Sequence, residues 1–328
     1  MKLLKILLLI LAVFLISCEG DVPLNIDPNS DLTLADLNFG STETLEVMTW
    51  NLENFAKAGS VTVDYLNTII QNLDVDIICL QEIESATYFQ SLLSALPQYE
   101  GFRANSAYLD IDLAILYKNS PDFELIAIEE LFTGNSWAFP RSPLQITFTW
   151  HNQTFYIINN HLKALSGSEN EERRKAACDL LADYVSISLP YENVIIVGDL
   201  NDLLTDPPSS NVFQSFLDQP QNFYFTDYYI AIGPSENWSW GNGTSHLDHI
   251  IITNDLFDEF SAAHTEITTL RIDDYLPNGW SQFESCLSDH LPVALRLPLG
   301  SRSIKCTAGL PASGALSTTH DSRLTTHD

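Results

Sequence analysis

Basic residues are scarce in this sequence. Its 328 residues include 15 Lys and Arg against 43 Asp and Glu, which gives a formal net charge of −28. Tight nonspecific binding to nucleic acid depends on basic side chains that neutralise phosphates, so the overall charge counts against a protein that coats DNA or RNA. The charge does not exclude an enzyme that acts on phosphate esters, because a metal ion bound in an acidic pocket reverses the local electrostatics.

The N-terminal hydrophobic run is too short to cross a bilayer. Residues 6–16 are eleven apolar residues after two lysines, whereas a transmembrane helix needs about 20. The pattern is typical of a secretory signal. It ends in LISC (15–18), which resembles the lipobox of bacterial lipoproteins, with ordinary signal cleavage as the alternative. We therefore expect a signal peptide at 1–17 and a lipid on Cys18 that anchors the protein to a membrane. The protein would then be exported from the cytoplasm, as a periplasmic or cell-surface lipoprotein or in secreted form.

Cysteine is also sparse. Of the four cysteines that follow the lipobox, Cys79 and Cys178 lie in apolar or helical sequence and are expected to be buried. Cys286 and Cys306 lie in loop-like sequence and could pair in an oxidising compartment. The sequence leaves that pairing open.

The middle of the chain reads as a single domain. Residues 18–44 are polar and suit a tether, 45–299 alternate short apolar runs with turns, and 300–328 are rich in Ser and Thr and are expected to be a disordered tail. Strands are expected at 45–50, 76–80, 113–118, 145–150, 155–158, 193–197, 247–253 and 292–297, and helices at 62–73, 86–96 and 171–187. Many short strands with few helices predict a layered α/β architecture with mixed or antiparallel sheets.

Polar side chains stand at one end of most predicted strands. Those that follow strands are Asn51, Glu53, Gln81, Glu82, Asn160, His161, Asp199 and Asn201, and those that precede strands are Asp112, Asp248, Asp289 and His290. If the two groups of strands run antiparallel, all of these side chains reach one edge of the sheets. The pattern predicts a single site built on a rigid scaffold.

Six motifs carry a resemblance to a known family. They are WNLENF (50–55), LQEIE (80–84), NNHLKA (159–164), GDLND (198–202), LDHI (247–250) and SDHLPV (288–293). In this order they resemble the endonuclease/exonuclease/phosphatase superfamily, which includes deoxyribonuclease I, AP endonucleases, bacterial sphingomyelinases and inositol-polyphosphate phosphatases. The resemblance covers roughly 45–299, and RSPLQITF (141–148) is most similar to the bacterial secreted nucleases of that family.

The resemblance implies a fold and a reaction. The fold is a four-layer α/β sandwich, in which two mixed β-sheets lie face to face between layers of helices. The reaction is metal-assisted hydrolysis of a phosphoester by in-line attack of water.

The resemblance also implies metal-binding and catalytic residues. Glu82 is the expected chief ligand of Mg²⁺, or of Mn²⁺ or Ca²⁺, with Asn51 beside it and Asp289 near the metal or the phosphate. A hard cation takes oxygen donors of this kind. His290 is expected to act as a general base on water or to stabilise the transition state, held by the carboxylate of Asp248.

A second imidazole and a second acidic group are implied as well. His161 is expected to protonate the leaving oxygen or to bind phosphate, with Asp112 as its orienting acid and Asp110 as the competitor for that role. Asp199 and Asn201 are expected to contact the attacked phosphate, the nucleophilic water or a second cation. Which group takes the proton of the water, Asp199 or the histidine of SDHLPV, is left open by the sequence.

Several residues near the motifs have less specific expectations. Arg141 is expected to bind a phosphate oxygen, and Lys163 to assist. Trp238 and Trp240 could stack on a base, meet a lipid headgroup or pack within a loop. The remaining histidines near the motifs are predicted to be structural: His246, His249 and His264.

The predicted function is a monomeric, extracytoplasmic, divalent-metal-dependent endonuclease that hydrolyses DNA or RNA. One alternative is a phosphatase or phospholipase of the same fold, acting like a sphingomyelinase or on an inositol phosphate. The other is a binding protein without catalysis. The sequence shows no hydrophobic hairpin of the kind that sphingomyelinases tend to carry, and it retains all the polar residues that catalysis would need.

Overall fold

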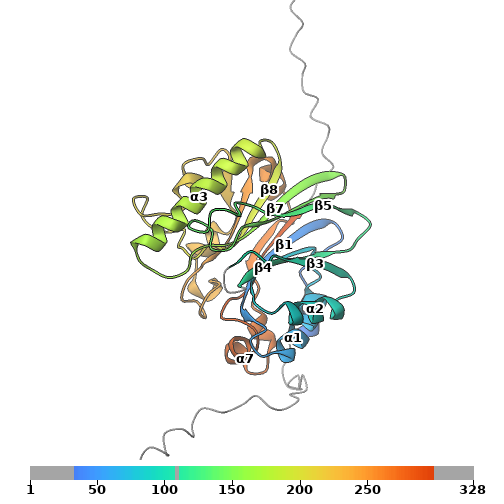
Figure 1. The fold of residues 1–328 in the computed structure, drawn as a ribbon. Helices are drawn as coiled ribbons and strands as arrows, with labels where there is room; N and C mark the ends of the chain where they lie inside the picture. Colours follow the sequence, from blue (N-terminus) through green and yellow to red (C-terminus); the bar gives the residue numbers. More distant parts are fainter. Residues whose placement is uncertain (1–32, 108–110, 299–328) are drawn as a thin grey trace, which may run out of the picture.

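Two six-stranded mixed sheets form the centre of the computed structural model, which describes residues 33–107 and 111–298 (Figure 1). The first sheet has the order β11 (Glu266–Thr269), β12 (Val293–Pro298), β1 (Thr44–Phe55), β2 (Ile77–Ile83), β4 (Asp112–Lys118) and β3 (Tyr99–Arg103). The second has the order β5 (Phe123–Glu130), β6 (Leu144–Trp150), β7 (Gln153–His161), β8 (Asn193–Asp199), β10 (Asp248–Thr253) and β9 (Phe223–Phe225). The pairs β1–β2 and β7–β8 are parallel, and the other pairs within the sheets are antiparallel.

The alternation of side chains along each central strand places them in two different layers of the core. In β8, Ile195 and Val197 face the other sheet, while Val194 and Ile196 face the helices. Successive side chains of a strand point to opposite faces, so a strand buried on both faces must be apolar throughout. The run VIIV at 194–197 therefore reflects a position in the middle of a four-layer sandwich.

Helices cover the outer face of each sheet. The first sheet is covered by α1 (Ser60–Leu73), α2 (Ala86–Ala95) and α7 (Gly279–Cys286), and the second by α3 (Ser168–Ser188), α4 (Gln214–Leu217) and α5 (Tyr228–Ala231). The short α6 (Phe257–Phe260) packs against the core between the sheets. The short 3₁₀ helices are η1 (Leu34–Asp36), η3 (Ser235–Asn237), η4 (Asn254–Leu256) and η5 (Ile272–Tyr275).

The predicted four-layer α/β sandwich is confirmed. Each of the eight predicted strands and three predicted helices corresponds to an observed element, whereas the strands β3, β5, β9 and β11 and the helices α4, α5, α6 and α7 were not predicted. Cys79 and Cys178 are buried, as expected. The predicted signal peptide, the Cys18 lipid site, most of the tether, the tail and Cys306 fall on residues outside the described ranges. None of the helices within those ranges is both long enough and apolar enough to cross a bilayer.

Candidate active site

The second sheet presents functional side chains on three neighbouring strands. Parallel β7 and β8 place His161 opposite Asp199, and antiparallel β10 places Asp248 opposite the same residue. The three side chains therefore lie at one edge of the sheet. Gly198, just before Asp199, has a φ of +143°, and a Cβ at this position would lie 2.0 Å from the backbone oxygen of Asn160. This glycine permits the close approach of β7 and β8 at the site.

The first sheet contributes Asn51 from β1 and Glu82 from β2. The Nδ2 of Asn51 donates to Glu82 Oε1 at 3.3 Å and to Asp199 Oδ2 at 2.9 Å, so this amide links the two sheets. The Oδ1 of Asn51 accepts the backbone N–H of Glu53 at 2.9 Å. The amide thus turns its nitrogen toward the carboxylates. This orientation orders the acids, and the role of Asn51 as a metal ligand stays a prediction.

His290 stands directly before the last strand and contacts three acids. Its Nδ1 lies 2.8 Å from Asp248 Oδ2, and its Nε2 lies 3.8 Å from both Asp199 Oδ2 and Asp289 Oδ1. Burial alone would lower the pKa of His290, but the charges of Asp248 and Asp199 outweigh burial and raise this pKa to about 10. The imidazole is therefore held in its protonated form.

Asp199 lies between two imidazoles that differ in charge. Its Oδ2 is 3.5 Å from His161 Nε2 and 3.8 Å from His290 Nε2. Burial raises the pKa of Asp199 to about 7, although the charge of His290 acts in the opposite direction. Burial also holds the pKa of His161 well below its usual value, and the charge of Arg141 adds to this effect. A neutral imidazole and a charged one thus flank a carboxyl group that titrates near neutral pH.

Asp112, the predicted partner of His161, contacts two other groups of the chain. The Oδ2 of Asp112 lies 2.8 Å from Nη2 of Arg103, and its Oδ1 accepts the backbone N–H of Ala107 at 3.0 Å. The Nδ1 of His161 is buried without a hydrogen-bond partner in the part of the chain that the structure describes. Arg103 pairs with this carboxylate, and the role of Asp112 as the orienting acid of His161 stays a prediction. The competitor, Asp110, lies outside the described residues.

Two cations lie beside the acidic cluster. Arg141 interacts electrostatically with Glu82 and Asp199, and burial lowers the pKa of its guanidinium despite these charges. The pKa of Lys163 is lowered by burial and by the neighbouring charges of Arg173 and Arg141. Within the described ranges, neither cation has a carboxylate within 4.0 Å. No carboxylate of the described ranges therefore forms an ion pair with either of them.

Left-handed backbone conformations cluster at the site. Glu82, Asn201 and Glu53 have φ values of +59°, +54° and +35°. Residues other than glycine adopt such values at a cost of about 1–3 kcal/mol, and they keep them only where the surroundings enforce them. At Asn201, the backbone N–H donates to Asp199 Oδ1 at 3.0 Å, and Nδ2 donates to the carbonyl of Leu162 at 3.3 Å. Hydrogen bonds thus hold the turn after β8 in a fixed shape.

Two hydrogen bonds that the sequence does not predict hold Asp289 in place. Its Oδ2 accepts the indole N–H of Trp240 at 2.9 Å, and its backbone N–H donates to Glu53 Oε2 at 2.9 Å. The indole of Trp240 is therefore tied to a site carboxylate, whereas that of Trp238 donates to the carbonyl of Ile230 at 3.1 Å. The only signal in the sequence was the position of Trp240, shortly before the LDHI motif.

A cavity of about 690 Å³ opens over these groups. Its lining includes Asn51, Glu53, Glu82, His161, Asp199, Asn201, Trp240, Asp289 and His290. Within the described ranges, Glu82, Asp199 and Asp289 have no Lys or Arg within 4.0 Å, and the basic side chains nearest to them are His161, which is neutral, and His290. Three carboxylates without a Lys or Arg counter-ion, all lining one cavity, are a donor set that fits a hard divalent cation such as Mg²⁺.

Comparisons with known proteins agree with this geometry. The Endonuclease/Exonuclease/phosphatase family matches residues 48–290. The fold is similar to that of D. rerio TDP2 in complex with a single-strand DNA product, at 16% identity and a TM-score of 0.60, over 78% of this chain and 99% of that one. It is also similar to the human Nocturnin catalytic domain with bound sulfate, at 21% identity and a TM-score of 0.57, over 78% of this chain and 94% of that one. A third similar structure is an endonuclease/exonuclease/phosphatase from Bacteroides vulgatus, at 14% identity and a TM-score of 0.55, over 78% of this chain and 99% of that one. No curated protein matches the chain.

Proposed function

The chain belongs to the endonuclease/exonuclease/phosphatase family, whose enzymes hydrolyse phosphoester bonds, and on that premise we propose that it is a divalent-metal-dependent endonuclease acting on DNA or RNA. One observation carries the proposal. Carboxylates from both sheets and two imidazoles of different charge surround a single cavity, with Asp199 within 4 Å of both imidazoles. A single phosphorus centre in that cavity would be within reach of all of these groups.

The metal would be held by Glu82 and Asp289. When bound, Mg²⁺ supplies positive charge that neutralises the phosphoryl oxygens. These two residues come from the two strands that flank β1 in the first sheet, one near the end of β2 and the other shortly before β12. Both carboxylates are fixed by donors of the chain itself, since Glu82 Oε2 accepts the backbone N–H of Asn54 at 3.0 Å and Asp289 Oδ2 accepts the indole of Trp240.

Proton transfer would be divided between Asp199 and His290. A carboxylate with a pKa of about 7 is a competent general base at neutral pH, so Asp199 is the group that takes the proton of the attacking water. His290, held as an imidazolium by Asp248, stabilises the negative charge that develops on the phosphoryl group. His161, neutral and buried, is the hydrogen-bonding partner of a phosphate or leaving oxygen.

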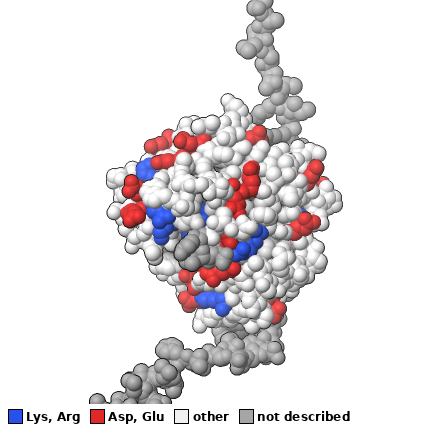
Figure 2. All heavy atoms as spheres, in the orientation of Figure 1, with Lys and Arg blue, Asp and Glu red and all other residues white. Residues whose placement is uncertain are grey.

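A local group of three cations supports a substrate with several phosphates. The face shown in Figure 2 carries many Asp and Glu and few Lys and Arg. Against that background Arg141, Lys163 and Arg173 lie close enough to influence one another, and Arg141 also influences Glu82. A polynucleotide offers phosphates on both sides of the scissile bond, which these cations can bind while the acids hold the metal. The single-strand DNA product in the TDP2 structure is consistent with this substrate class.

Export and lipid anchoring are part of the same proposal. They rest on the apolar run at 6–16 and on the LISC sequence that ends at Cys18. An enzyme held outside the cytoplasm would meet nucleic acid released into its surroundings.

The test offers the purified protein plasmid DNA, RNA, sphingomyelin and inositol phosphates, each with Mg²⁺, Mn²⁺ or EDTA. We expect metal-dependent cleavage of nucleic acid that EDTA abolishes. Cleavage of the lipid or of inositol phosphates alone would replace the nuclease by the phosphatase or phospholipase alternative. Binding of nucleic acid with no cleavage under any metal would favour the binding protein.

A further inference from the structure

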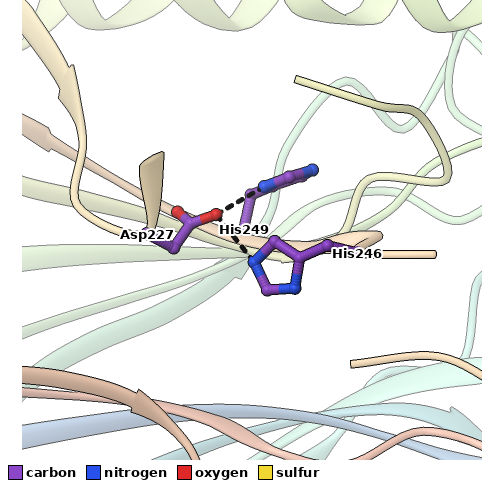
Figure 3. A group of neighbouring side chains, drawn as sticks. All are labelled: Asp227, His246 and His249. Atoms are coloured by element: carbon purple, nitrogen blue, oxygen red, sulfur yellow. Dashed lines mark hydrogen bonds and ion pairs between the residues drawn. The ribbon is translucent and has the colours of Figure 1, made fainter. Parts of the chain in front are cut away.

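A second group of ionisable side chains, Asp227, His246 and His249, lies next to the turn at 199–202 that follows β8 (Figure 3). Asp227 follows β9, His246 precedes β10, and His249 is the second residue of β10. All three are at most 2% exposed. They do not line the cavity of the active site, so none of them is a candidate for contact with substrate.

The hydrogen bonds of the group determine where its protons lie. His249 Nε2 lies 3.1 Å from the carbonyl of Asp202, and because a carbonyl can only accept, this nitrogen carries a proton. His246 Nδ1 accepts the backbone N–H of Ser239 at 3.3 Å, so the proton of His246 is on Nε2 and points to Asp227 Oδ2 at 3.0 Å. Both assignments follow from backbone groups, whose roles are fixed.

The remaining contact joins His249 to Asp227. Nδ1 of His249 lies 2.6 Å from Asp227 Oδ2, so a proton must lie between these two atoms. The carboxylate also accepts the N–H of His246 and, on Oδ1, the backbone N–H of Ile250 at 3.0 Å. These two donors favour the ionised carboxylate, which leaves the shared proton on the imidazole. In agreement, Asp227 holds the pKa of His249 above its usual value despite burial.

The same contacts argue against a metal ion at this position. A metal bound by His246 Nε2 would require the ring proton on Nδ1, where it would meet the N–H of Ser239. The Asp227 and His249 ligand atoms are also only 2.6 Å apart, closer than two ligands about 2.0–2.1 Å from a tetrahedral zinc would be. Protons satisfy this group without a metal.

The turn of GDLND is clamped at Asp202 from two directions. His249 holds the backbone carbonyl of Asp202, and Arg174 Nε donates to its Oδ2 at 2.7 Å. Between these anchors and β8 lies Asn201, in the left-handed conformation, and the turn begins at Asp199. The two hydrogen bonds at Asp202 fix one end of the four-residue turn that carries Asp199 and Asn201.

We infer that His249 is a positioning residue, which acts as a buried imidazolium on Asp227 and holds the turn 199–202 so that Asp199 and Asn201 face the cavity. This inference rests on the proposed function for its effect on rate. Its structural content, a charged His249 bonded to the turn, is independent of any activity.

The first experiment measures the ring nitrogens of the histidines by ¹H–¹⁵N NMR at pH 7, with parallel determination of bound zinc. We expect both nitrogens of His249 to carry protons and His246 to be the neutral Nε2–H tautomer. The ionisable groups that act on His249 are Asp227, His246 and Asp248. A lone pair on either nitrogen of His249, or one equivalent of zinc, would overturn the inference, and this measurement needs no variant to fold.

The second experiment compares His249→Gln with His246→Gln, which removes a bond to the same carboxylate without touching the turn. For His249→Gln we expect shifted backbone amide signals at 199–202 and a loss of kcat of about 10- to 100-fold with little change in KM. His246→Gln should leave both nearly unchanged. Equal effects of the two variants, or unmoved amides in His249→Gln, would refute the positioning role. If the wild type cleaves no substrate, the proposed function fails, while the amide signals still decide the role of His249.

Discussion

His290 Nδ1 lies 2.8 Å from Asp248 Oδ2, and the two residues come from adjacent ends of different sheets. Asp248 begins a strand of the second sheet, and His290 precedes the last strand of the first. Their hydrogen bond therefore crosses the sandwich, as does the bond from Asn51 to Asp199. The candidate active site thus lies between the two sheets, and its geometry depends on how the sheets pack.

Loss of His290 should remove turnover and leave the fold intact. For His290→Ala we expect kcat to fall by about 10²- to 10⁴-fold with the melting temperature little changed, because the imidazole faces the cavity and acts in the reaction. Kinetics and circular dichroism measure the two effects. His264→Ala is the control, since His264 is exposed. Wild-type rates in the His290 variant would disprove its role.

Glu82→Gln should abolish the response to metal. The change keeps the shape of the side chain and removes the charge of the expected principal ligand, so Mg²⁺ titrated by calorimetry should bind much more weakly and cleavage should cease. Glu84→Gln is the matched control, two residues along the chain, where the side chain does not line the cavity. Metal affinity that is equal in the two variants would exclude Glu82 as the ligand.

Arg141→Gln should raise KM more than it lowers kcat. Its guanidinium has no carboxylate within 4.0 Å in the described part of the chain. Its interaction with Glu82 and Asp199 is electrostatic attraction over a longer distance. A hydrogen bond to a charged phosphate contributes about 1.5–3 kcal/mol, which corresponds to a roughly 10- to 150-fold loss in kcat/KM. Lys175→Gln, in a surface pair with Asp179, is the control. An unchanged KM would show that Arg141 does not bind substrate.

The fold should lose stability as the pH rises from about 4.5 to about 8. Glu46 is fully buried in β1, and burial raises its pKa from 4.5 to about 8. The folded protein keeps this proton while the unfolded chain releases it, so the contribution is complete below pH 4.5 and is lost as the pH reaches about 8. Asp76, which accepts the backbone N–H of Glu46 at 3.1 Å, also has a raised pKa and acts in the same direction.

Denaturant unfolding of the wild type and of Glu46→Gln across this range measures the effect. The variant carries no titrating proton at this position, so its free energy of unfolding should change less between pH 5 and pH 8. Parallel curves for the two proteins would show that Glu46 is ionised in the folded state.

Alternation and motif spacing were sufficient to predict the central strands and most of the site. Strands such as β8 are apolar throughout because they are buried on both faces, and their polar ends stand out against that background. The edge strands gave no such signal. β5, for example, is largely exposed, and β9 and β11 have three and four residues, too few for a period to show.

The contacts between side chains could not be predicted in the same way. Asp112 precedes a strand as the site acids do, but Arg103 on the neighbouring strand takes its carboxylate, and only the pairing of β3 with β4 reveals this. The partner of His249 lies 22 residues earlier in the chain, in a loop whose sequence marks no site. Histidines predicted to be structural thus form an organised network because of tertiary contacts that sequence spacing does not encode.

The pairing of β1 with β12 brings the two ends of the domain together. β1 is synthesised first and can pair with β12 only after that last strand has been made. The segment that contains β12 also contains His290. A nascent or prematurely terminated chain therefore has neither a closed core nor the imidazole. The complete set of side chains around the cavity is therefore assembled only when synthesis of the domain is nearly finished, which under the proposed function would delay cleavage of nucleic acid until then.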